Sequence, residues 1–571
     1  MKAKMFSALL LIAAICSLSV GLLYAQSDPS REILVYFASG IHRAPAGQAA
    51  TVRSAAIERL LARFKIDQNQ LVSAFPNFNE ADTLKQLVDG RRISLPNIAR
   101  IFKVRVPSNA AREEIIDSLK KLPEVLFAEP NGTTEPHVIP NDQYFSYQWA
   151  LQGGGGTGKI QAPEAWDITT GNSNNVIGIV DGGIDPTHPD LSGKVTGDAG
   201  YGWSGHGIHV AGIASAKTNN IVGIAGVDWN AQLHAERVDN TDDAGTYQAV
   251  VDAVNYSGSM NVFNNSWGLT PAGRYSTTVR MAFAYAYKMN RTAVVSMGND
   301  NGSQTQYPAG FGQGIIAVGA TDAGDVVAGF SDIGNHIDVS APGVSIYSTY
   351  RNPDYQYLSG TSMAAPHVTG IASLLKTYNA NLYNDDIEHI IQLSANKVPG
   401  MNGQDWTQEY GYGRVNARRA LDKLRSPNVL TQATTTGGTD QGGSDYFQMV
   451  IYGAQAYGLS DGTYIVKRHE VRKTVSFSPM KNHSAWGRGV STNGWANEGS
   501  VNFALGWCDA VPGTLTGTSV TLRTYVYEVW NILGQSLGWK PAQPSNTTFA
   551  YTILGEPNPL SVYITGLHHA L

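Results

Sequence analysis

The chain has 571 residues, more than one hydrophobic core usually supports, so we expect several folding units. Hydrophobic residues make up 42% of it and charged residues only 15%, a composition typical of globular domains that excludes wholesale disorder. The small formal net charge of -5 and the lack of a long Lys/Arg run exclude nucleic acid as an expected partner.

The first residues have the order of a secretory signal peptide. Two lysines precede an apolar stretch from 6 to about 23, and the small residue Ala25 stands before polar residues. This order predicts a signal peptide at 1–25 that is cut near Ala25, and therefore an exported protein. The length of the apolar stretch leaves an uncleaved membrane anchor as the alternative.

Residues 31 to about 131 have the pattern of a small α/β unit. Alternating and β-branched runs predict strands at 33–38, 101–106 and 125–129. Apolar residues at helical spacing predict helices at about 52–64 and 110–122.

Residues 136–426 alternate short β-branched runs, such as 176–180, 292–296 and 315–318, with helical stretches. Such alternation predicts a doubly wound α/β domain whose mostly parallel sheet has helices on both faces. The following residues, 427–445, are rich in Thr, Gly, Gln and Asp and show no apolar period, so we expect a linker there.

Residues 446–571 carry alternating Val, Tyr, Thr and Trp in runs such as 519–529, broken by Gly, Pro and Asn. This pattern predicts an antiparallel β-sandwich. Its tryptophans favour core packing over an exposed aromatic face for a ligand. They are Trp486, Trp495, Trp507, Trp530 and Trp539. Removal of this segment during maturation stays open.

Three short motifs place reactive side chains at strand ends and helix starts, where an α/β sheet exposes them. Asp181 ends the run Val-Ile-Gly-Ile-Val, His206 lies in Gly-His-Gly-Ile-His-Val-Ala-Gly, and Ser362 lies in Gly-Thr-Ser-Met-Ala-Ala-Pro-His. Singly, each has a structural alternative as a turn Asp, a satisfied polar His or an N-cap Ser. Together they match a serine nucleophile, the base that activates it and the carboxylate that orients the base. His209, on the same stretch as His206, is expected to be a satisfied polar residue.

In this order, the three segments resemble the signatures of the subtilisin family, and of its thermitase-like members in particular. The resemblance covers roughly 140–424. It implies a serine endopeptidase that hydrolyses proteins or peptides through an acyl-enzyme, with Asp181, His206 and Ser362 as its catalytic triad. Asn299, in Met-Gly-Asn, matches the residue whose amide stabilises the oxyanion.

The resemblance also implies a substrate cleft. The segment Asn-Ser-Trp-Gly at 265–268 resembles the strand that pairs with the substrate, and 296–298 would form the opposite wall of the first specificity pocket. Small residues there imply broad cleavage after large apolar or aromatic side chains. The implied substrate-binding residues are Ser266, Trp267, Gly268, Ser296, Met297 and Gly298.

Calcium is the cofactor that the resemblance implies, in a structural role, because a hard cation requires several oxygen ligands. Asp142, Asp190 and Asn220 match ligand positions of the family, and the backbone carbonyls of Val222 and Ile224 would complete the set. The alternative is that these are ordinary turn residues.

Residues 31–131 resemble the inhibitor propeptide of the family, a ferredoxin-like fold that occupies the active site of its own chain until it is cut away. Cleavage is expected between 130 and 140. The mature protein is then expected to be extracellular, monomeric and free of the membrane.

Two positions depart from the family pattern. Gly182 stands where Ser or Thr usually follows the catalytic Asp, and Ile208 stands where Thr usually lies between the two histidines of the His206 motif. Both changes remove hydroxyls near the triad, so we expect reduced activity rather than a complete loss of activity. The rival hypothesis is a weak or silent protein that acts as a binding module through its C-terminal domain.

Overall fold

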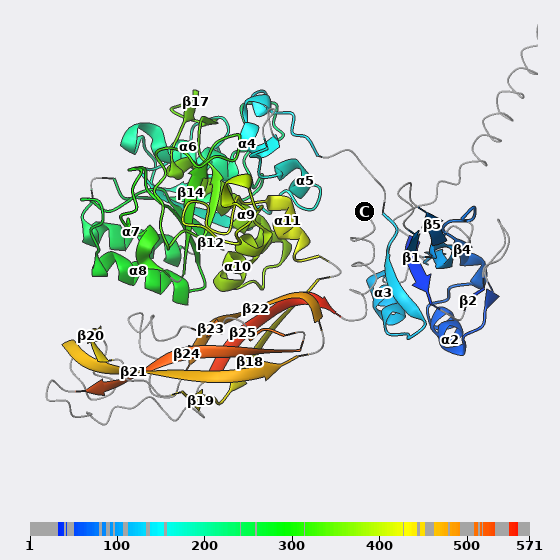
Figure 1. The fold of residues 1–571 in the computed structure, drawn as a ribbon. Coiled ribbons are helices and arrows are strands. Elements are labelled where there is room, and N and C mark those ends of the chain that lie inside the picture. The colour runs from blue at the N-terminus through cyan, green and yellow to red at the C-terminus, as the bar shows by residue number, and fades with distance from the viewer. Residues whose placement is uncertain are drawn as a thin grey trace, which may run out of the picture. The chain divides into compact units, whose positions relative to one another are not determined.

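The structure is a computed structural model, shown as a ribbon in Figure 1. It describes residues 32–557 except for 39–40, 43–50, 79–82, 87–91, 95–96, 107–111, 133–137, 153–156, 240, 257–259, 313, 426–427, 442–445, 452–461, 478–479, 492–507, 512–513, 517 and 531–547. The predicted signal peptide lies outside the described residues. Within them, no helix has the length and apolar character needed to cross a membrane.

The described part of the chain divides into two units, one before His137 and the other His137–Pro557. In the first unit, a four-stranded antiparallel sheet has the order β4-β7-β1-β8. The elements are β1 (Glu32–Phe37), β2 (Ile41–His42), β3 (Thr51–Val52), α2 (Ala55–Arg63), β4 (Leu71–Ser73), β5 (Leu84–Gln86), β6 (Arg92–Ser94), β7 (Ile101–Arg105), α3 (Arg112–Lys120) and β8 (Val125–Pro130).

Alternation along β1 builds the core of this unit. Ile33, Val35 and Phe37 point to one face, because successive side chains of a strand alternate. They pack there with Ile57 of α2 and Ile116 of α3. Both helices and the three long strands lie where the sequence predicted them.

The second unit begins with a seven-stranded sheet of order β10-β11-β9-β12-β13-β14-β15, in which every pairing is parallel. The chain starts this sheet near its middle and builds outward in both directions, which confirms the doubly wound α/β prediction. The strands are β9 (Val176–Asp181), β10 (Val195–Gly197), β11 (Gln232–Arg237), β12 (Met260–Asn265), β13 (Thr292–Ser296), β14 (Ile315–Thr321) and β15 (Val339–Pro342).

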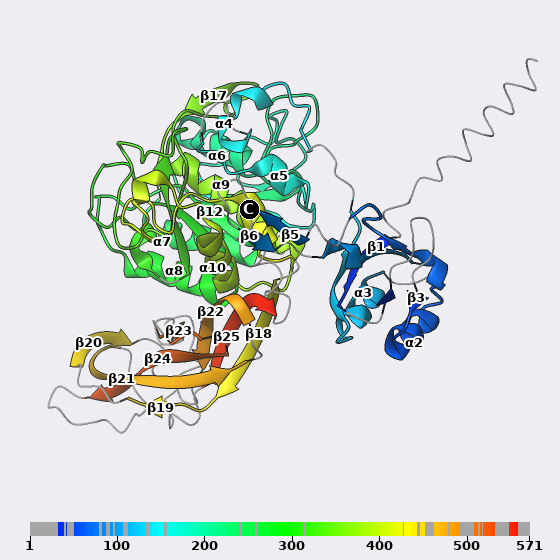
Figure 2. The ribbon, with the colours of Figure 1, turned by 45° about the vertical axis from the view of Figure 1, so that its right-hand side comes forward.

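Helices cover both faces of this sheet (Figures 1 and 2). Phe263 and Val295 pack with α7 and α8, whereas Val262 and Val294, their neighbours on the same strands, pack with α9. The helices are α4 (Trp149–Gln152), α5 (Ala162–Trp166), α6 (His206–Ser215), α7 (Asp243–Asn255), α8 (Thr277–Lys288), α9 (Thr361–Tyr378), α10 (Asn384–Ser394) and α11 (Ala417–Asp422). A hairpin, β16 (Ile346–Thr349) with β17 (Tyr355–Leu358), contacts α6.

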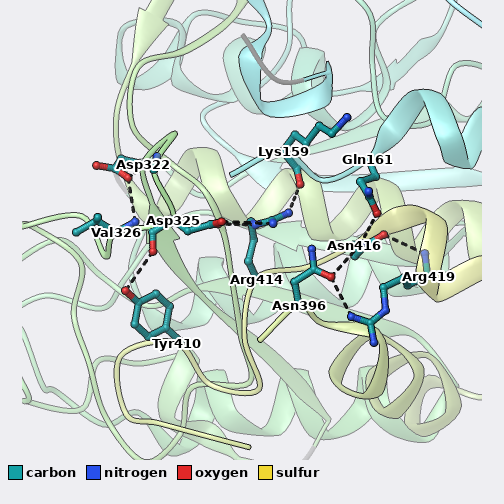
Figure 3. Close-up of polar contacts among 11 residues, drawn as sticks. Lys159, Gln161, Asp322, Asp325, Val326, Asn396, Tyr410, Arg414, Asn416 and Arg419 are labelled. Atoms are coloured by element: carbon teal, nitrogen blue, oxygen red, sulfur yellow. Dashed lines mark hydrogen bonds and ion pairs between the residues drawn. The ribbon is translucent and has the colours of Figure 1, made fainter. Parts of the chain in front are cut away.

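A buried ion pair ties together distant segments of the α/β domain (Figure 3). Arg414 donates from Nε to Asp325 Oδ1 at 2.5 Å and from Nη1 to the carbonyl of Lys159. Tyr410 Oη donates to the carbonyl of Asp325 at 3.1 Å. The two charged side chains are only 5% and 4% exposed, so each depends on the other for compensation of its charge.

The C-terminal strands form two antiparallel sheets, one of order β18-β25-β22 and one of order β19-β21-β24-β23 with β20 beside β21. Val471, Val520, Phe549 and Ile553, from both sheets, share one core. The strands are β18 (Val429–Thr436), β19 (Thr439–Asp440), β20 (Tyr446–Ile451), β21 (Gly462–Ser476), β22 (Met480–Ser491), β23 (Cys508–Ala510), β24 (Ser519–Trp530) and β25 (Thr548–Pro557).

The start of this region differs from the sequence-based expectation. The linker prediction for 427–445 was wrong, because Val429–Thr436 is a strand that pairs along its whole length with β25. Its β-branched threonines suit a strand, but the partner lies far downstream, so no local pattern reveals the pairing. Trp486 is 2% exposed and belongs to a core, as expected, whereas the side chains of the other four tryptophans lie outside the described part.

Candidate active site

The carboxyl ends of the central strands carry the predicted site residues. β9 ends at Asp181, β12 leads into Ser266, and β13 leads into the loop with Asn299. Because these strands are parallel neighbours, their carboxyl ends lie at one edge of the sheet. Helix α6 begins at His206, and helix α9 begins one residue before Ser362.

The predicted Asp–His pair is present. His206 Nδ1 lies 2.9 Å from Asp181 Oδ1 and 3.1 Å from Oδ2, and the Asp181 side chain is fully buried. The N–H of Gly182 also donates to Asp181 Oδ1 at 2.7 Å. Gly207 lets the two approach, since a Cβ there would lie 2.5 Å from the Gly183 carbonyl and 3.0 Å from Asp181 Oδ1.

This pairing sets the chemistry of the imidazole. Burial lowers the pKa of His206, but the charge of Asp181 and its hydrogen bond raise it, and the pKa ends above its ordinary value of 6.5. A carboxylate at Nδ1 holds the proton on that nitrogen, so the neutral ring carries its lone pair on Nε2. Such a ring can accept a proton and is stabilised once it is charged.

Ser362 is fixed by a reciprocal pair of bonds with Ser266. Ser362 Oγ donates to the Ser266 carbonyl at 3.2 Å, and Ser266 Oγ donates to the Ser362 carbonyl at 2.9 Å. Asn264 Nδ2 donates to Ser266 Oγ at 2.8 Å. Helices α6 and α9 pack together, with Met363 in one apolar cluster with Ile208. The start of α9 is thus held both to the end of β12 and to α6.

Asn299 is oriented by Thr361, the residue before Ser362. The Thr361 N–H donates to Asn299 Oδ1 at 2.9 Å, and its Oγ1 donates to the same atom at 3.0 Å. Two donors at the oxygen identify the other amide atom, Nδ2, as the one that can donate. A Cβ on Gly360 would lie 3.5 Å from Asn299 Nδ2. Sequence reasoning missed this orienting role of Thr361, although its position directly before the predicted nucleophile could have suggested a role in the site.

The residues predicted to bind substrate differ in how they are placed. Trp267 is partly buried against Phe283, with ring centroids 6.2 Å apart, and Gly268 is exposed. Ser296 is buried at the end of β13, and Ser266 holds the start of α9, as described above.

The Met297 side chain is 0% exposed and lies in the cluster under α8, so only its backbone could contribute to the predicted pocket wall, which stays a prediction. Alternation along the strand turns it to the same face as Val295, away from an open pocket. Gly298 has a φ of 114°, and a Cβ there would lie 2.1 Å from the buried carboxylate of Asp332. Only glycine suits this position.

The predicted calcium ligands gather around one loop. Asp142 accepts the N–H of Asn219 at 2.8 Å, and Asp190 accepts Asn220 Nδ2 at 3.1 Å and the N–H of Ile224 at 2.8 Å. Burial and the charge of Asp142 raise the pKa of Asp190 to about 6.

Tyr355 Oη donates to Asp190 Oδ2 at 3.0 Å, and the N–H of Val222 donates to Asn220 Oδ1 at 2.8 Å. These hydrogen-bond partners of Asp142 and Asp190 are all uncharged. Two neighbouring carboxylates suit calcium in kind, but Asn220 turns its amide nitrogen toward Asp190, and the described residues contain no group of three acidic, His or Cys side chains placed to hold a metal.

The two departures from the family pattern have structural counterparts. Gly182 lies against Gly202, because a Cβ on Gly182 would lie 2.6 Å from the Gly202 carbonyl carbon and oxygen. The Ile208 side chain is fully buried, and its carbonyl accepts Thr349 Oγ1 at 2.7 Å. His209 is also buried, and its Nε2 lies 3.0 Å from the carbonyls of two hairpin residues. Burial lowers the pKa of His209 to about 3, which favours the neutral ring. Its Nε2 is satisfied as expected, whereas its buried Nδ1 has no hydrogen-bond partner among the described residues.

Comparison with known proteins agrees with this geometry. The family model of the subtilases matches residues 172–413. A thermophilic serine proteinase of a Bacillus species is 36% identical over 60% of this chain and 84% of its own length. Thermitase of Thermoactinomyces vulgaris is 40% identical over 49% of this chain and 99% of its own length. Among solved structures, a protease of Pseudoalteromonas arctica has a TM-score of 0.46 and 28% identity, covering 50% of this chain and 99% of that one.

The parallel sheet, the Asp181–His206 pair at its carboxyl edge and the sequence matches to the family model and the two proteinases lead to one family. The chain belongs to the subtilase family of serine proteases.

Proposed function

We propose that this subtilase is a secreted serine endopeptidase, made as a self-processing precursor, with Asp181, His206 and Ser362 as its catalytic triad. The observation that carries the proposal is the 2.9 Å contact between His206 Nδ1 and the buried carboxylate of Asp181. This contact lies at the same edge of the sheet as Ser266, whose hydroxyl bonds the backbone of Ser362.

The chemistry follows from these positions. Ser362 Oγ attacks the carbonyl carbon of the substrate while His206 Nε2 takes its proton, and Asp181 stabilises the imidazolium that forms. The oxyanion of the tetrahedral intermediate accepts hydrogen bonds from Asn299 Nδ2 and from the N–H of Ser362 at the start of α9. His206 then gives the proton to the leaving amine. Water, activated by the same base, hydrolyses the acyl-enzyme.

The precursor contains the inhibitor propeptide in residues 26–135, after removal of 1–25. Its support is the resemblance of residues 31–131 to the family's propeptide, together with the separate core of this unit around Ile33 and Ile57. Cleavage between 130 and 140 releases an extracellular monomer. Its substrates are proteins and peptides, cut broadly after large apolar or aromatic side chains. Calcium bound by Asp142, Asp190, Asn220 and the carbonyls of Val222 and Ile224 stabilises it without taking part in the reaction.

The test is to produce the precursor without residues 1–25 and to follow both its own processing and the hydrolysis of unfolded casein. Ser362→Ala is compared with Ser359→Ala, which alters an exposed serine three residues away. We expect the wild type and Ser359→Ala to process and hydrolyse, and Ser362→Ala to do neither. A folded, calcium-loaded wild type with neither activity would favour the binding-module hypothesis instead.

A further inference from the structure

Asp386, in the first turn of α10, is a completely buried carboxylate. Its Oδ2 accepts the N–H of Tyr383 at 3.0 Å, a bond expected of an acidic residue that caps its own helix. Acidic residues at helix starts usually face water on their other side. Asp386 does not, and so its remaining lone pairs need other donors.

Those donors come from the C-terminal domain, residues 429–557. Gln432 Nε2 donates to Asp386 Oδ2 at 2.6 Å, Trp486 Nε1 donates to Oδ1 at 2.9 Å, and Thr552 Oγ1 donates to Oδ1 at 2.6 Å. They belong to β18, β22 and β25, the three strands of one sheet. With the N–H of Tyr383 they make four donors, which match the roughly four acceptor sites of an ionised carboxylate.

Apolar packing surrounds this polar contact. Trp486 is 2% exposed, and its ring stacks on His389, one helical turn beyond Asp386, at 5.0 Å and 3° between the ring planes. Leu554 of β25 is 3% exposed and lies in the same apolar cluster as Leu382 and Ile390 of the α/β domain. Water is therefore kept from the carboxylate, which strengthens its charged hydrogen bonds.

Asn428, the residue before β18, also contacts the end of α11 and Arg425. The N–H of Asn428 donates to the Arg425 carbonyl at 2.9 Å, and Asn428 Nδ2 donates to the Asp422 carbonyl at 3.1 Å. β18 then begins at Val429. Asn428 is thus tied to the end of the α/β domain immediately before the strand that replaces part of the predicted linker.

We propose that the C-terminal domain is a permanent part of the mature protein, held on α10 by the buried carboxylate of Asp386, and that maturation removes sequence only from the N-terminal side. Separation of the domains breaks three hydrogen bonds to a charged group and exposes Trp486 and Leu554. The contact also braces α9, whose Lys376 Nζ donates to the carbonyls of Ala380 and Leu382 in the turn before α10. Since α9 begins beside Ser362, loss of the domain reduces the thermal stability of the catalytic unit.

The test uses the full chain without residues 1–25 and with Ser362→Ala, so its result does not depend on the proposed activity. Trypsin can cut the backbone between the domains at exposed Arg425, and size-exclusion chromatography then shows whether the two parts stay together. We expect them to co-elute. In the double variant Trp486→Phe, Thr552→Val, which keeps an aromatic ring at 486 and the side-chain shape at 552 but removes two donors, we expect their dissociation constant to rise by roughly tenfold or more.

Asp386→Ala should have a larger effect, and Glu409→Ala, which removes an exposed carboxylate elsewhere on the α/β domain, should have none. Free separation of the cut wild-type parts would overturn the proposal. So would variants that hold together as well as the Glu409→Ala control. The mass of the mature wild-type protein gives an independent reading, because a fully active, equally stable product that lacks residues 429–557 would also contradict it.

Discussion

For the substitution Gly182→Ser, the sequence pattern and the structure predict opposite effects on activity. By sequence, Gly182 lacks a hydroxyl that the family usually has next to the catalytic Asp, so Gly182→Ser should raise activity. In the structure, a Cβ on Gly182 would lie 2.6 Å from the carbonyl carbon and oxygen of Gly202. A Cβ on Gly202 would in turn lie 2.4 Å from the Gly182 carbonyl oxygen, so the two glycines are packed backbone to backbone. We therefore expect Gly182→Ser to lower both stability and activity.

The size of the effect follows from the overlap. A contact of 2.6 Å with backbone atoms cannot be relieved by turning a side chain, and overpacking of this kind costs about 1–3 kcal/mol. For a domain of this size, each kcal/mol lowers the melting temperature by about 2–4 °C. Activity should fall further than stability alone requires, because Gly182 donates its N–H to Asp181 Oδ1.

The assay compares melting temperature and kcat/KM of the wild type, Gly182→Ser and Gly329→Ser. Gly329 is exposed, and a Cβ added to it would meet no heavy atom within 4 Å beyond its chain neighbours, so it controls for the change of residue type. Gly329→Ser should match the wild type. A Gly182→Ser variant that is equally stable and more active would refute the packing argument and support the sequence-based one.

Further predictions concern charge. Asp181 raises the pKa of His206 above 6.5, and the base acts when it is neutral, so kcat/KM should fall as the pH drops through that raised pKa. Asp181→Asn should reduce kcat roughly 10⁴-fold with little change in melting temperature. Burial lowers the pKa of Lys194 from 10.5 to about 7, so between about pH 7 and 10 this lysine is protonated in the unfolded chain but not in the folded one. The free energy of unfolding should therefore rise over that pH range. In a Ser362→Ala background, denaturant titrations of Lys194→Met should lack that rise. Arg414→Leu should cost about 3–5 kcal/mol, because the partner carboxylate stays buried without its cation, and adding Asp325→Asn should restore part of the loss. Excess chelator should lower the melting temperature of the wild type but not of Asp190→Asn; equal curves with and without chelator in the wild type would count against the calcium site.

Local patterns predicted the parts of the fold that neighbouring residues determine. The β-branched run ending at Asp181 and the small-residue helix starting at His206 were readable, because strand ends and helix starts follow from the residues around them. β18 was missed because its partner β25 is far away in the sequence. The burial of Met297 depends on which face of β13 it takes, and the contact of Gly182 with Gly202 depends on how two loops meet.

The site shows the same division. The motifs indicated which side chains react, but not what holds them. Thr361 orients Asn299 and Ser266 holds the backbone of Ser362 through contacts between separate elements, which no single motif contains. The three partners of Asp386 from the C-terminal domain are likewise visible only in the fold, because they come from three strands far apart in the chain.

The central claim is that Ser362 is a nucleophile activated by His206 and Asp181. A phosphonyl fluoride tests it directly, because an activated serine oxygen bonds to phosphorus and releases fluoride. Mass spectrometry of the processed protein should show one added phosphonyl group on the peptide that contains Ser362, and His206→Ala, prepared with the propeptide already removed, should react far more slowly. A folded protein that stays unlabelled, or that is labelled equally well without His206, would contradict the account.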